Sequence, residues 1–253
     1  MSGPVITCQN VTKCFGKTEV LRGVDLEVPR GAIVGLVGTN GSGKSTLIKC
    51  LLGLLKVSSG TARILGEDSW DLSASVKNTL GYVPQEIKLY PWMRVSQVID
   101  YTGAFYEKWD SYRCNELLEQ WELDGSKWIK TLSGGQLQRL ALVLALGHHP
   151  SLLILDEPAA SLDPVGRRSF LKSLLEMNED GGQSVLFSTH ITSDLERVAS
   201  HVAFLHDGRV QFFGELEELK DHVGGNLEDI FLQMNRTPEF AGLNHVSGDQ
   251  SHV

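Results

Sequence analysis

The chain has 253 residues, of which 42% are apolar and 21% are charged, and its formal net charge is −8. This length and composition are typical of a globular protein with one sizeable core, built as one domain with subdomains or as two small domains. The acidic balance and the lack of a run of Lys or Arg argue against nucleic acid, or an anionic membrane, as a partner held by bulk charge.

Several kinds of membrane and metal protein are disfavoured by the sequence. The longest nearly continuous apolar stretch, residues 140–147, is far shorter than the roughly 20 residues that a bilayer-spanning helix needs. The opening "MSGPVITCQNVTK" lacks the basic-then-apolar pattern of a secretory signal. The four cysteines form no CxxC pair, and the eight histidines form no cluster with ligand spacing. We therefore expect reduced, buried or half-buried thiols in a cytoplasmic protein, and no transition-metal site.

The N-terminal segments predict two kinds of strand and a helix. Residues 5–30 alternate apolar and polar side chains, which predicts a small antiparallel sheet. Residues 32–38, "AIVGLVG", predict a buried strand that leads into a glycine-rich loop. Residues 46–55 predict a helix after that loop. Its apolar face would carry Leu47, Leu51, Leu54 and Leu55.

The loop "GTNGSGKS" matches the pattern GxxxxGK[ST] and lies between the predicted strand and helix, as this pattern requires. Glycines let the backbone wrap so that successive N–H groups converge on phosphates. We expect Lys44 to reach the β- and γ-phosphates and the Ser45 hydroxyl to bind Mg²⁺. A glycine turn without a ligand would leave the strand–loop–helix context unexplained. The predicted nucleotide-contacting residues here are Gly38, Thr39, Asn40, Gly41, Ser42, Gly43, Lys44, Ser45 and Thr46.

Three later segments, residues 79–84, 151–157 and 184–190, are too apolar to be half-exposed and predict further buried strands. Because helical segments separate them, we expect an α/β fold with a parallel sheet covered on both faces. Residues 202–214 predict a hairpin with Asp207-Gly208 at its turn.

The predicted strand "LLILDEP" ends in two carboxylates, at the edge of a parallel sheet where ligands bind. We expect Asp156 to hold Mg²⁺, directly or through water. If the strand continues, Glu157 points the other way and is free to orient or deprotonate an attacking water. The alternative is a pair of solvated acids at a strand end.

Between about residues 87 and 147 the chain has no strand-like run, and we interpret it as a helical subdomain inserted into the α/β core. Within it, "LSGGQLQR" precedes a long apolar helical run, with Ser133 in the position of an N-cap. Gly134 and Gly135 would permit close approach to an exposed helix N-terminus with spare N–H donors. That describes a second phosphate receptor, but an ordinary capped helix explains the same residues equally well.

The phosphate loop, "LSGGQLQR" and "LLILDEP", in this order, resemble the ATP-binding subunit of an ABC transporter over residues 5–220. The resemblance implies a P-loop NTPase: a RecA-like parallel-sheet core, a small antiparallel β subdomain and an inserted helical subdomain. The ABC ATPase domain would comprise residues 1–225, and residues 226–253 would be a partly disordered C-terminal tail. In this family the second glycine motif binds the γ-phosphate of ATP held by the other subunit of a head-to-tail dimer. Here that motif is Ser133, Gly134, Gly135 and Gln136.

The same resemblance assigns four further residues, each of which also has an ordinary structural explanation. Gln85 matches a glutamine that senses Mg²⁺ or water, His190 a histidine that contacts the γ-phosphate, and Phe15 an aromatic that stacks on adenine. Asp163 matches a loop at the dimer interface, but is also placed to cap a helix. Without the resemblance Gln85 and His190 would be read as strand-end residues and Phe15 as core. The resulting catalytic set is Lys44, Gln85, Glu157 and His190.

The function that the resemblance implies is a Mg²⁺-dependent ATPase that dimerises with itself or a similar chain. It would power transport through a separate multi-spanning permease on the cytoplasmic face of the cell membrane. Aromatic residues between 90 and 110 would meet a coupling helix of that permease, although most of them could instead form the subdomain core. The segments "FYEKWD", "SDLERVA" and "NLEDIFLQM" resemble ABC-2 type exporters. The alternatives are an importer subunit, an ABC ATPase acting outside membranes, and a subunit that uses ATP as a dimerisation switch.

Overall fold

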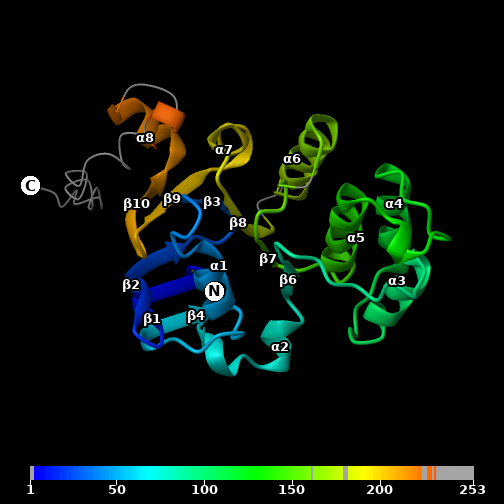
Figure 1. The fold of residues 1–253 in the computed structure, drawn as a ribbon, viewed down its shortest axis with the longest axis horizontal. Coiled ribbons are helices and arrows are strands. Elements are labelled where there is room, and N and C mark those ends of the chain that lie inside the picture. Colours follow the sequence, from blue (N-terminus) through cyan, green and yellow to red (C-terminus); the bar gives the residue numbers. More distant parts are fainter. Residues whose placement is uncertain (1–2, 161, 179–181, 224–226, 230, 232–253) are drawn as a thin grey trace, which may run out of the picture.

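The computed structural model describes residues 3–160, 162–178, 182–223, 227–229 and 231, and Figure 1 shows an α/β fold in which helices accompany two sheets. The six-stranded sheet has the order β10-β9-β3-β8-β7-β6, and all its pairings are parallel except that of β9 with β10. Its strands are β3 (Ile33–Val37), β6 (Leu80–Val83), β7 (Leu152–Leu155), β8 (Ser184–Thr189), β9 (His201–His206) and β10 (Arg209–Glu215).

The predicted antiparallel sheet is confirmed and is larger than expected. Its order is β2-β1-β4-β5, and every pairing is antiparallel. The sequence predicted β1 and β2 from their alternation but not the two later strands. The four strands are β1 (Ile6–Phe15), β2 (Thr18–Val28), β4 (Ser59–Ile64) and β5 (Glu67–Asp68).

Three of the helices, α3, α4 and α5, form a group beyond β6, seen on the right of Figure 1. This group is the helical subdomain predicted for about residues 87–147. Two short 3₁₀ segments, Ser69–Asp71 and Ile129–Thr131, accompany the α-helices. The α-helices are α1 (Lys44–Leu51), α2 (Ala74–Lys77), α3 (Val95–Gly103), α4 (Ser111–Gln120), α5 (Gly134–Leu146), α6 (Pro164–Asn178), α7 (Thr192–Val198) and α8 (Leu216–Val223).

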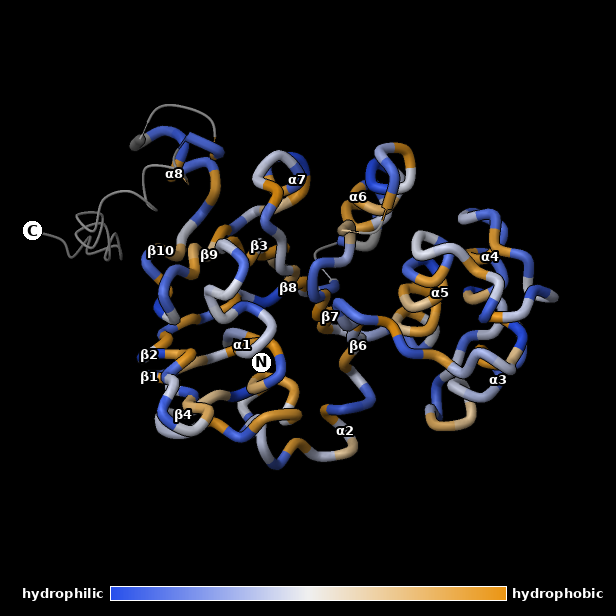
Figure 2. The backbone as a smooth tube through the Cα atoms, viewed as in Figure 1, coloured by the Kyte–Doolittle hydropathy of each residue, from blue (hydrophilic) through white to orange (hydrophobic). Residues whose placement is uncertain are grey.

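The six-stranded sheet is covered on both faces, as predicted. Along β7, Leu153 and Leu155 belong to one hydrophobic cluster, whereas Leu152 and Ile154 belong to another. The first cluster extends into the helical subdomain, α6 and α7, and the second into α1 and the antiparallel sheet. Figure 2 accordingly colours β7 and much of α5 as hydrophobic. Burial on both faces explains why β3, β7 and β8 lack the alternation of a half-exposed strand.

Two local predictions were wrong. The helix predicted for residues 46–55 ends at Leu51, and Leu54 is exposed. Gly53 adopts a positive φ of 67°, and a Cβ there would lie 2.3 Å from the carbonyl oxygen of Ser69, so the chain turns away at this point. Strand β6 is half-buried instead of fully buried at Leu80 and Tyr82, because it is the edge strand of its sheet.

The predicted hairpin is present as β9 and β10, and its turn braces two other elements. Asp207 and Gly208 both have positive φ, 46° and 74°, as a type I′ turn requires. The Gly208 N–H donates to the carbonyl of Ser42 in the phosphate loop at 3.2 Å, and the Gly208 carbonyl accepts from the Arg22 N–H at 2.8 Å. The Arg22 side chain also pairs with Asp207. The hairpin turn is therefore fixed to both β2 and the phosphate loop.

All four cysteines are free: Cys8, Cys50 and Cys114 are buried, as expected, but Cys14 is exposed near the end of β1. Burial raises the pKa of Cys8 to about 12 and that of Cys114 to about 11, which keeps these thiols protonated.

The predicted C-terminal tail, residues 226–253, lies outside the described residues except for 227–229 and 231. Leu227 is buried there, and the Phe231 ring stacks on Phe204 with 5.9 Å between centroids. Across the part of the chain that the structure describes, no helix has the length and apolar character needed to span a bilayer.

Candidate active site

The sequence motifs meet at one edge of the six-stranded sheet because the strands that carry them are parallel neighbours. Strand β8 lies between β3 and β7, and β6 pairs with β7 on the other side. The phosphate loop follows β3, Gln85 follows β6, the acidic pair follows β7 and His190 follows β8. Residues distant in sequence are thus assembled at the carboxyl ends of four strands, where ligands of such sheets bind.

The phosphate loop is shaped by glycines that no other residue could replace without strain. Gly41 and Gly43 have positive φ, 84° and 109°. A Cβ at Gly38 would lie 2.4 Å from both the Leu205 carbonyl oxygen and Ser42 Oγ. Gly43 occupies the N-cap position of α1 and supplies no side-chain cap, so the N–H groups of the first turn are left for a ligand.

A pocket of about 420 Å³ opens over this loop. It adjoins the first turn of α1 and also receives residues from β2, from the segment after β6 and from the segment after β7. Its lining residues are Val20, Asn40, Gly41, Gly43, Lys44, Ser45, Thr46, Gln85 and Glu157. Six of the nine predicted loop residues and two of the three predicted Mg²⁺ donors therefore line one cavity.

Lys44 is held inside the pocket by groups of the protein. Its Nζ donates to the Gly38 carbonyl at 2.8 Å and to the Thr39 carbonyl at 3.3 Å. The same Nζ lies 3.3 Å from Glu157 Oε1, and 6% of each of the two side chains is exposed. The lysine charge is thus balanced by a carboxylate at the position from which it would reach a phosphate.

Glu157 occupies a turn, so the reason given for its orientation from strand alternation was wrong. Strand β7 ends at Leu155, and Glu157 adopts a left-handed conformation with φ of 50°, which is uncommon for a residue with a side chain. Its Oε2 lies 2.8 Å from His190 Nδ1. Glu157 is therefore bracketed by Lys44 on one oxygen and by His190 on the other.

Ser188 fixes the acidic pair, and the sequence analysis missed it. Its hydroxyl donates to Asp156 Oδ1 at 2.7 Å and accepts from the Glu157 N–H at 2.8 Å. All three residues are buried. A polar residue within a strand predicted to be buried was the available signal, since a buried hydroxyl requires a partner.

The predicted Mg²⁺ donors suit that ion only in combination with a nucleotide. Ser45 and Gln85 line the pocket, and Asp156 directly precedes the pocket residue Glu157. Hydroxyl, amide and carboxylate oxygens are the hard donors that Mg²⁺ takes beside substrate phosphates. Among the described residues, no group of three or more His, Cys, Asp or Glu side chains could hold a metal.

The second glycine motif begins α5, outside the pocket lining. Ser133 is the N-cap, as predicted: its Oγ accepts from the Gln136 N–H at 3.2 Å, and its own N–H donates to Gln136 Oε1 at 3.0 Å. This capping box uses the Gln136 N–H, so that donor is not spare as expected. Ser133 and Gly134 are exposed. The motif therefore presents an open helix N-terminus on the surface of the helical subdomain.

Asp163 and Phe15 also lie outside the pocket lining, as do five further predicted residues: Gly38, Thr39, Ser42, Asp156 and His190. Asp163 precedes α6, and its Oδ1 accepts from the Gly166 N–H at 2.7 Å, so it caps that helix as the alternative interpretation required. Phe15 ends β1 with 47% of its surface exposed, and Lys13 Nζ lies 5.1 Å from its ring centroid. Phe15 is thus an exposed aromatic and not a core residue.

Comparison with known proteins supports the family suggested by the motifs. The chain matches the ABC transporter family over residues 21–160. A probable sulfate/thiosulfate import ATP-binding protein of Chlorella vulgaris is 37% identical over 90% of this chain and 98% of its own length. A linearmycin resistance ATP-binding protein of Bacillus subtilis (strain 168) is 31% identical over 91% of this chain and 74% of its own length.

A solved structure agrees with this result. It is a dimeric post-hydrolysis state of an ATP-binding cassette bound to ADP and phosphate, and it is 27% identical to this chain with a TM-score of 0.75. The match covers 83% of this chain and 98% of that one. The prediction from the order of the motifs is confirmed: the chain belongs to the ABC transporter family.

Proposed function

We propose that this chain is an ATP-hydrolysing subunit that powers transport through a separate membrane protein. The observation that carries the proposal is the cluster of three side chains at the glycine-rich loop: Lys44 and Glu157 line its pocket, and His190 contacts Glu157. A carboxylate that contacts a cation through one oxygen and an imidazole through the other provides groups suited to ATP hydrolysis around a γ-phosphate.

In the proposed reaction, Lys44 leaves the loop carbonyls and Glu157 to bind the β- and γ-phosphates. Glu157 then accepts a proton from the attacking water, and general-base assistance of this kind contributes roughly 10² to 10⁴ in rate. His190, already 2.8 Å from Glu157, contacts the γ-phosphate and holds the carboxylate in position. Backbone N–H groups of residues 38–46 stabilise the developing charge. Phe15 stacks on the adenine with the face of its ring.

Ser45, Gln85 and Asp156 would hold Mg²⁺ together with phosphate oxygens. When bound, the ion would neutralise charge that develops on the transferred phosphoryl group. This chain's part is to orient the donors, and the hydrogen bond from Ser188 to Asp156 serves that purpose.

The second half of each ATP site would come from another copy or a similar chain. Ser133, Gly134, Gly135 and Gln136 would bind the γ-phosphate in the partner, and Asp163 would lie at the interface. Two observations support this arrangement. None of these residues lines the pocket, and Ser133, Gly134 and Asp163 are exposed at the surface, where a second molecule could reach them. The similar cassette bound to ADP and phosphate is a dimer. ATP binding would close the dimer, and hydrolysis would reopen it.

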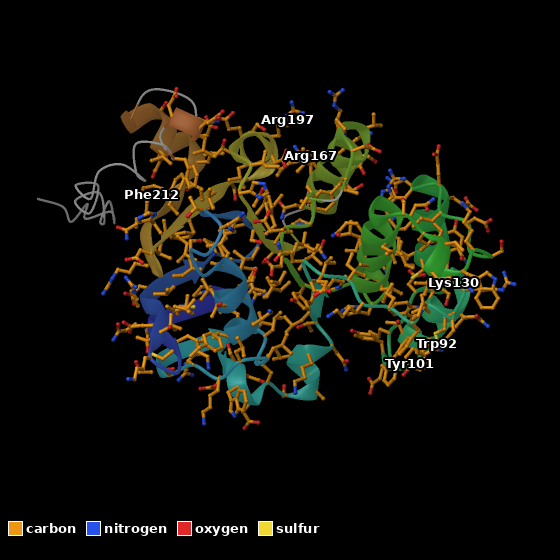
Figure 3. The ribbon with its side chains drawn as sticks, in the orientation of Figure 1. Trp92, Tyr101, Lys130, Arg167, Arg197 and Phe212 are labelled. Carbon is orange, nitrogen blue, oxygen red and sulfur yellow. The ribbon has the colours of Figure 1, made fainter. Side chains whose placement is uncertain are left out.

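The membrane partner would dock on four exposed aromatic rings of the helical subdomain, which we call the aromatic patch: Tyr90, Trp92, Tyr101 and Phe105. Neighbouring rings lie 5.2 to 5.5 Å apart, and Figure 3 marks Trp92 and Tyr101. Of the other two aromatics between residues 90 and 110, Trp109 packs against the core and Tyr106 stacks on Trp109, so fewer of them form the core than the alternative interpretation required. Exposed aromatics in a group favour a protein contact.

We propose export as the direction of transport, at the cytoplasmic face of a cell membrane and in the manner of ABC-2 type systems. The resemblance of residues 105–110 and 193–199 to such systems supports this direction, as does the similarity to a linearmycin resistance protein. Similarity to an import protein supports the opposite direction. Transport of a labelled compound into or out of vesicles that contain the complex distinguishes the two.

The experiment that tests the ATPase and dimer proposals uses two substitutions. Glu157→Gln keeps the shape of the side chain, so we expect ATP-dependent dimers in sedimentation and loss of turnover. Ser133→Arg should leave ATP binding to the monomer intact and abolish both dimerisation and turnover. Wild-type hydrolysis by the Glu157→Gln protein would refute the assigned base, and loss of monomer binding in Ser133→Arg would refute the two-chain site.

A further inference from the structure

A buried ion pair joins helices α6 and α7 beside the active site. Arg167 Nε in α6 lies 3.6 Å from Asp194 Oδ2 in α7. The Asp194 side chain is 6% exposed and that of Arg167 is 29% exposed. Figure 3 marks Arg167 and Arg197, which come from the neighbouring helices α6 and α7. The pair is separate from the pocket lined by the phosphate loop.

The contact between the two side chains is incomplete. Arg167 Nε and Asp194 Oδ2 are both buried, and neither makes a hydrogen bond. Three cationic or polar groups face Asp194, namely Arg167, Arg197 and His190, and each acts to lower its pKa. Burial nevertheless dominates and raises the pKa of Asp194 above its usual value. A buried charge pair that lacks its hydrogen bonds calls for an explanation, because such groups are ordinarily satisfied.

The position of each partner along its helix supplies that explanation. Arg167 lies one turn after Asp163, and its N–H donates to the Asp163 carbonyl at 2.8 Å. Asp194 lies in the first turn of α7, four residues after His190. The pair therefore connects the first turns of two helices. One is α6, which follows the proposed interface residue Asp163, and the other is α7, which follows the proposed γ-phosphate contact His190.

We propose that Arg167 and Asp194 are positioning residues that hold Asp163 and His190 in register, and that their contact closes to a hydrogen-bonded pair when the ATP dimer forms. This inference rests on the proposed function, since it takes Asp163 as an interface residue and His190 as a γ-phosphate contact. Closure gives the buried Arg167 Nε and Asp194 Oδ2 a hydrogen bond to each other. It does so when Asp163 meets the partner subunit and His190 meets the γ-phosphate. Neither side chain lines the phosphate pocket, so the pair acts through His190 and Asp163.

The test measures kcat and KM for ATP in the full chain with Asp194→Asn, Arg167→Met and the double variant. We expect each single substitution to lower kcat by about tenfold and to change KM by less than about twofold. A tenfold loss is within the range of effects of mutations in residues that couple two sites. The double variant should lose no more than either single one, because the two side chains act as a unit. Asp194→Glu should retain most of the wild-type kcat, since it keeps the carboxylate and its longer side chain can bring an oxygen closer to Arg167 Nε than 3.6 Å.

A matched control is the exposed pair of Lys172 and Glu176 on the same helix α6. Glu176→Gln also converts a carboxylate to an amide, and we expect wild-type kcat from it. A purely structural pair would lower the melting temperature and leave kcat unchanged in Asp194→Asn, and that result would overturn the inference. Additive losses in the double variant, or equal losses in Asp194→Glu and Asp194→Asn, would also overturn it. The Glu157→Gln dimer experiment needs no change in α6 or α7, so its failure would identify the proposed function as the error.

Discussion

Lys44 and Glu157 form an ion pair in the interior of the phosphate pocket, with 3.3 Å between Nζ and Oε1. Without a nucleotide, the cation that would bind phosphate neutralises the carboxylate that would activate water. In the proposed mechanism, ATP draws Lys44 away before Glu157 becomes free as a base. Under that proposal, the pair couples recognition of the triphosphate to exposure of the catalytic group.

This pair predicts an unusual stability effect at Lys44. Lys44→Met leaves Glu157 buried without its counter-charge, so we expect the free energy of unfolding to fall by about 3 kcal/mol in the absence of nucleotide. Adding Glu157→Gln removes the uncompensated charge and should recover most of that loss. Urea unfolding of the three proteins measures the effect. Equal stability of the single and double variants would contradict it.

The bridging hydroxyl of Ser188 predicts a second effect, on turnover. Ser188→Ala removes the bonds to Asp156 and to the Glu157 N–H, so we expect kcat to fall about tenfold, together with a loss of about 1–3 kcal/mol in stability. Ser184→Ala is the matched control, because Ser184 accepts from the Gly31 N–H at the opposite end of the same strand. It should lose stability and keep kcat. Similar kcat values in the two variants would argue against a role for Ser188 in positioning.

The aromatic patch predicts a selective loss of membrane association. Trp92 is 66% exposed, so Trp92→Ala should leave the melting temperature and the ATPase rate of the isolated chain unchanged. We expect this variant to recover much less of the membrane partner in a mild-detergent pull-down from the native host. Tyr112→Ala, at a 74% exposed ring in α4, is the control and should recover as much as the wild type. Equal recovery by both variants would remove the patch as the docking surface.

His148 predicts a pH dependence of stability. Burial lowers its pKa, against the opposing effect of its hydrogen bond to the Leu80 carbonyl, and the nearby His149 lowers it further. As the pH falls below about 6.5, the unfolded chain therefore takes up a proton that the folded chain does not, and the free energy of unfolding decreases. The loss ends once the pH is below the folded-state pKa.

We expect His148→Gln to reduce the stability difference between pH 7.5 and pH 5.5. Urea unfolding at both values compares the variant with the wild type. His201, whose pKa burial also lowers, remains in both proteins and contributes equally to each. An unchanged difference would show that His148 does not titrate in this range.

The parts of the fold that the sequence predicted are those with a strong local signal. The type I′ turn at Asp207-Gly208 and the buried runs of β3, β7 and β8 needed no knowledge of distant residues. Strand β4 was missed because it lacks a strong local signal and is stabilised by pairing with β1, which lies about fifty residues earlier. The end of α1 was missed because close packing of Gly53 against Ser69 is a tertiary contact.

The same division applies to the candidate site. The glycine loop and the acidic pair are recognisable from spacing, since each is a run of consecutive residues. Ser188 contacts residues 31 and 32 positions away, and no local pattern records that distance. The capping box at Ser133 and Gln136 follows from spacing. The role of its exposed N-terminus, by contrast, depends on a second molecule.

The hairpin turn that braces the phosphate loop has a consequence for biosynthesis. Strand β3 pairs on both sides with strands from residues 184–206, and Ser42 accepts a hydrogen bond from Gly208. A nascent chain that has emerged from the ribosome to residue 150 carries β3 and every residue of the loop. It carries neither β8 nor β9, the strands that pair with β3 on its two sides. Competence to bind ATP should therefore arise late and abruptly during translation, once the hairpin has left the exit tunnel.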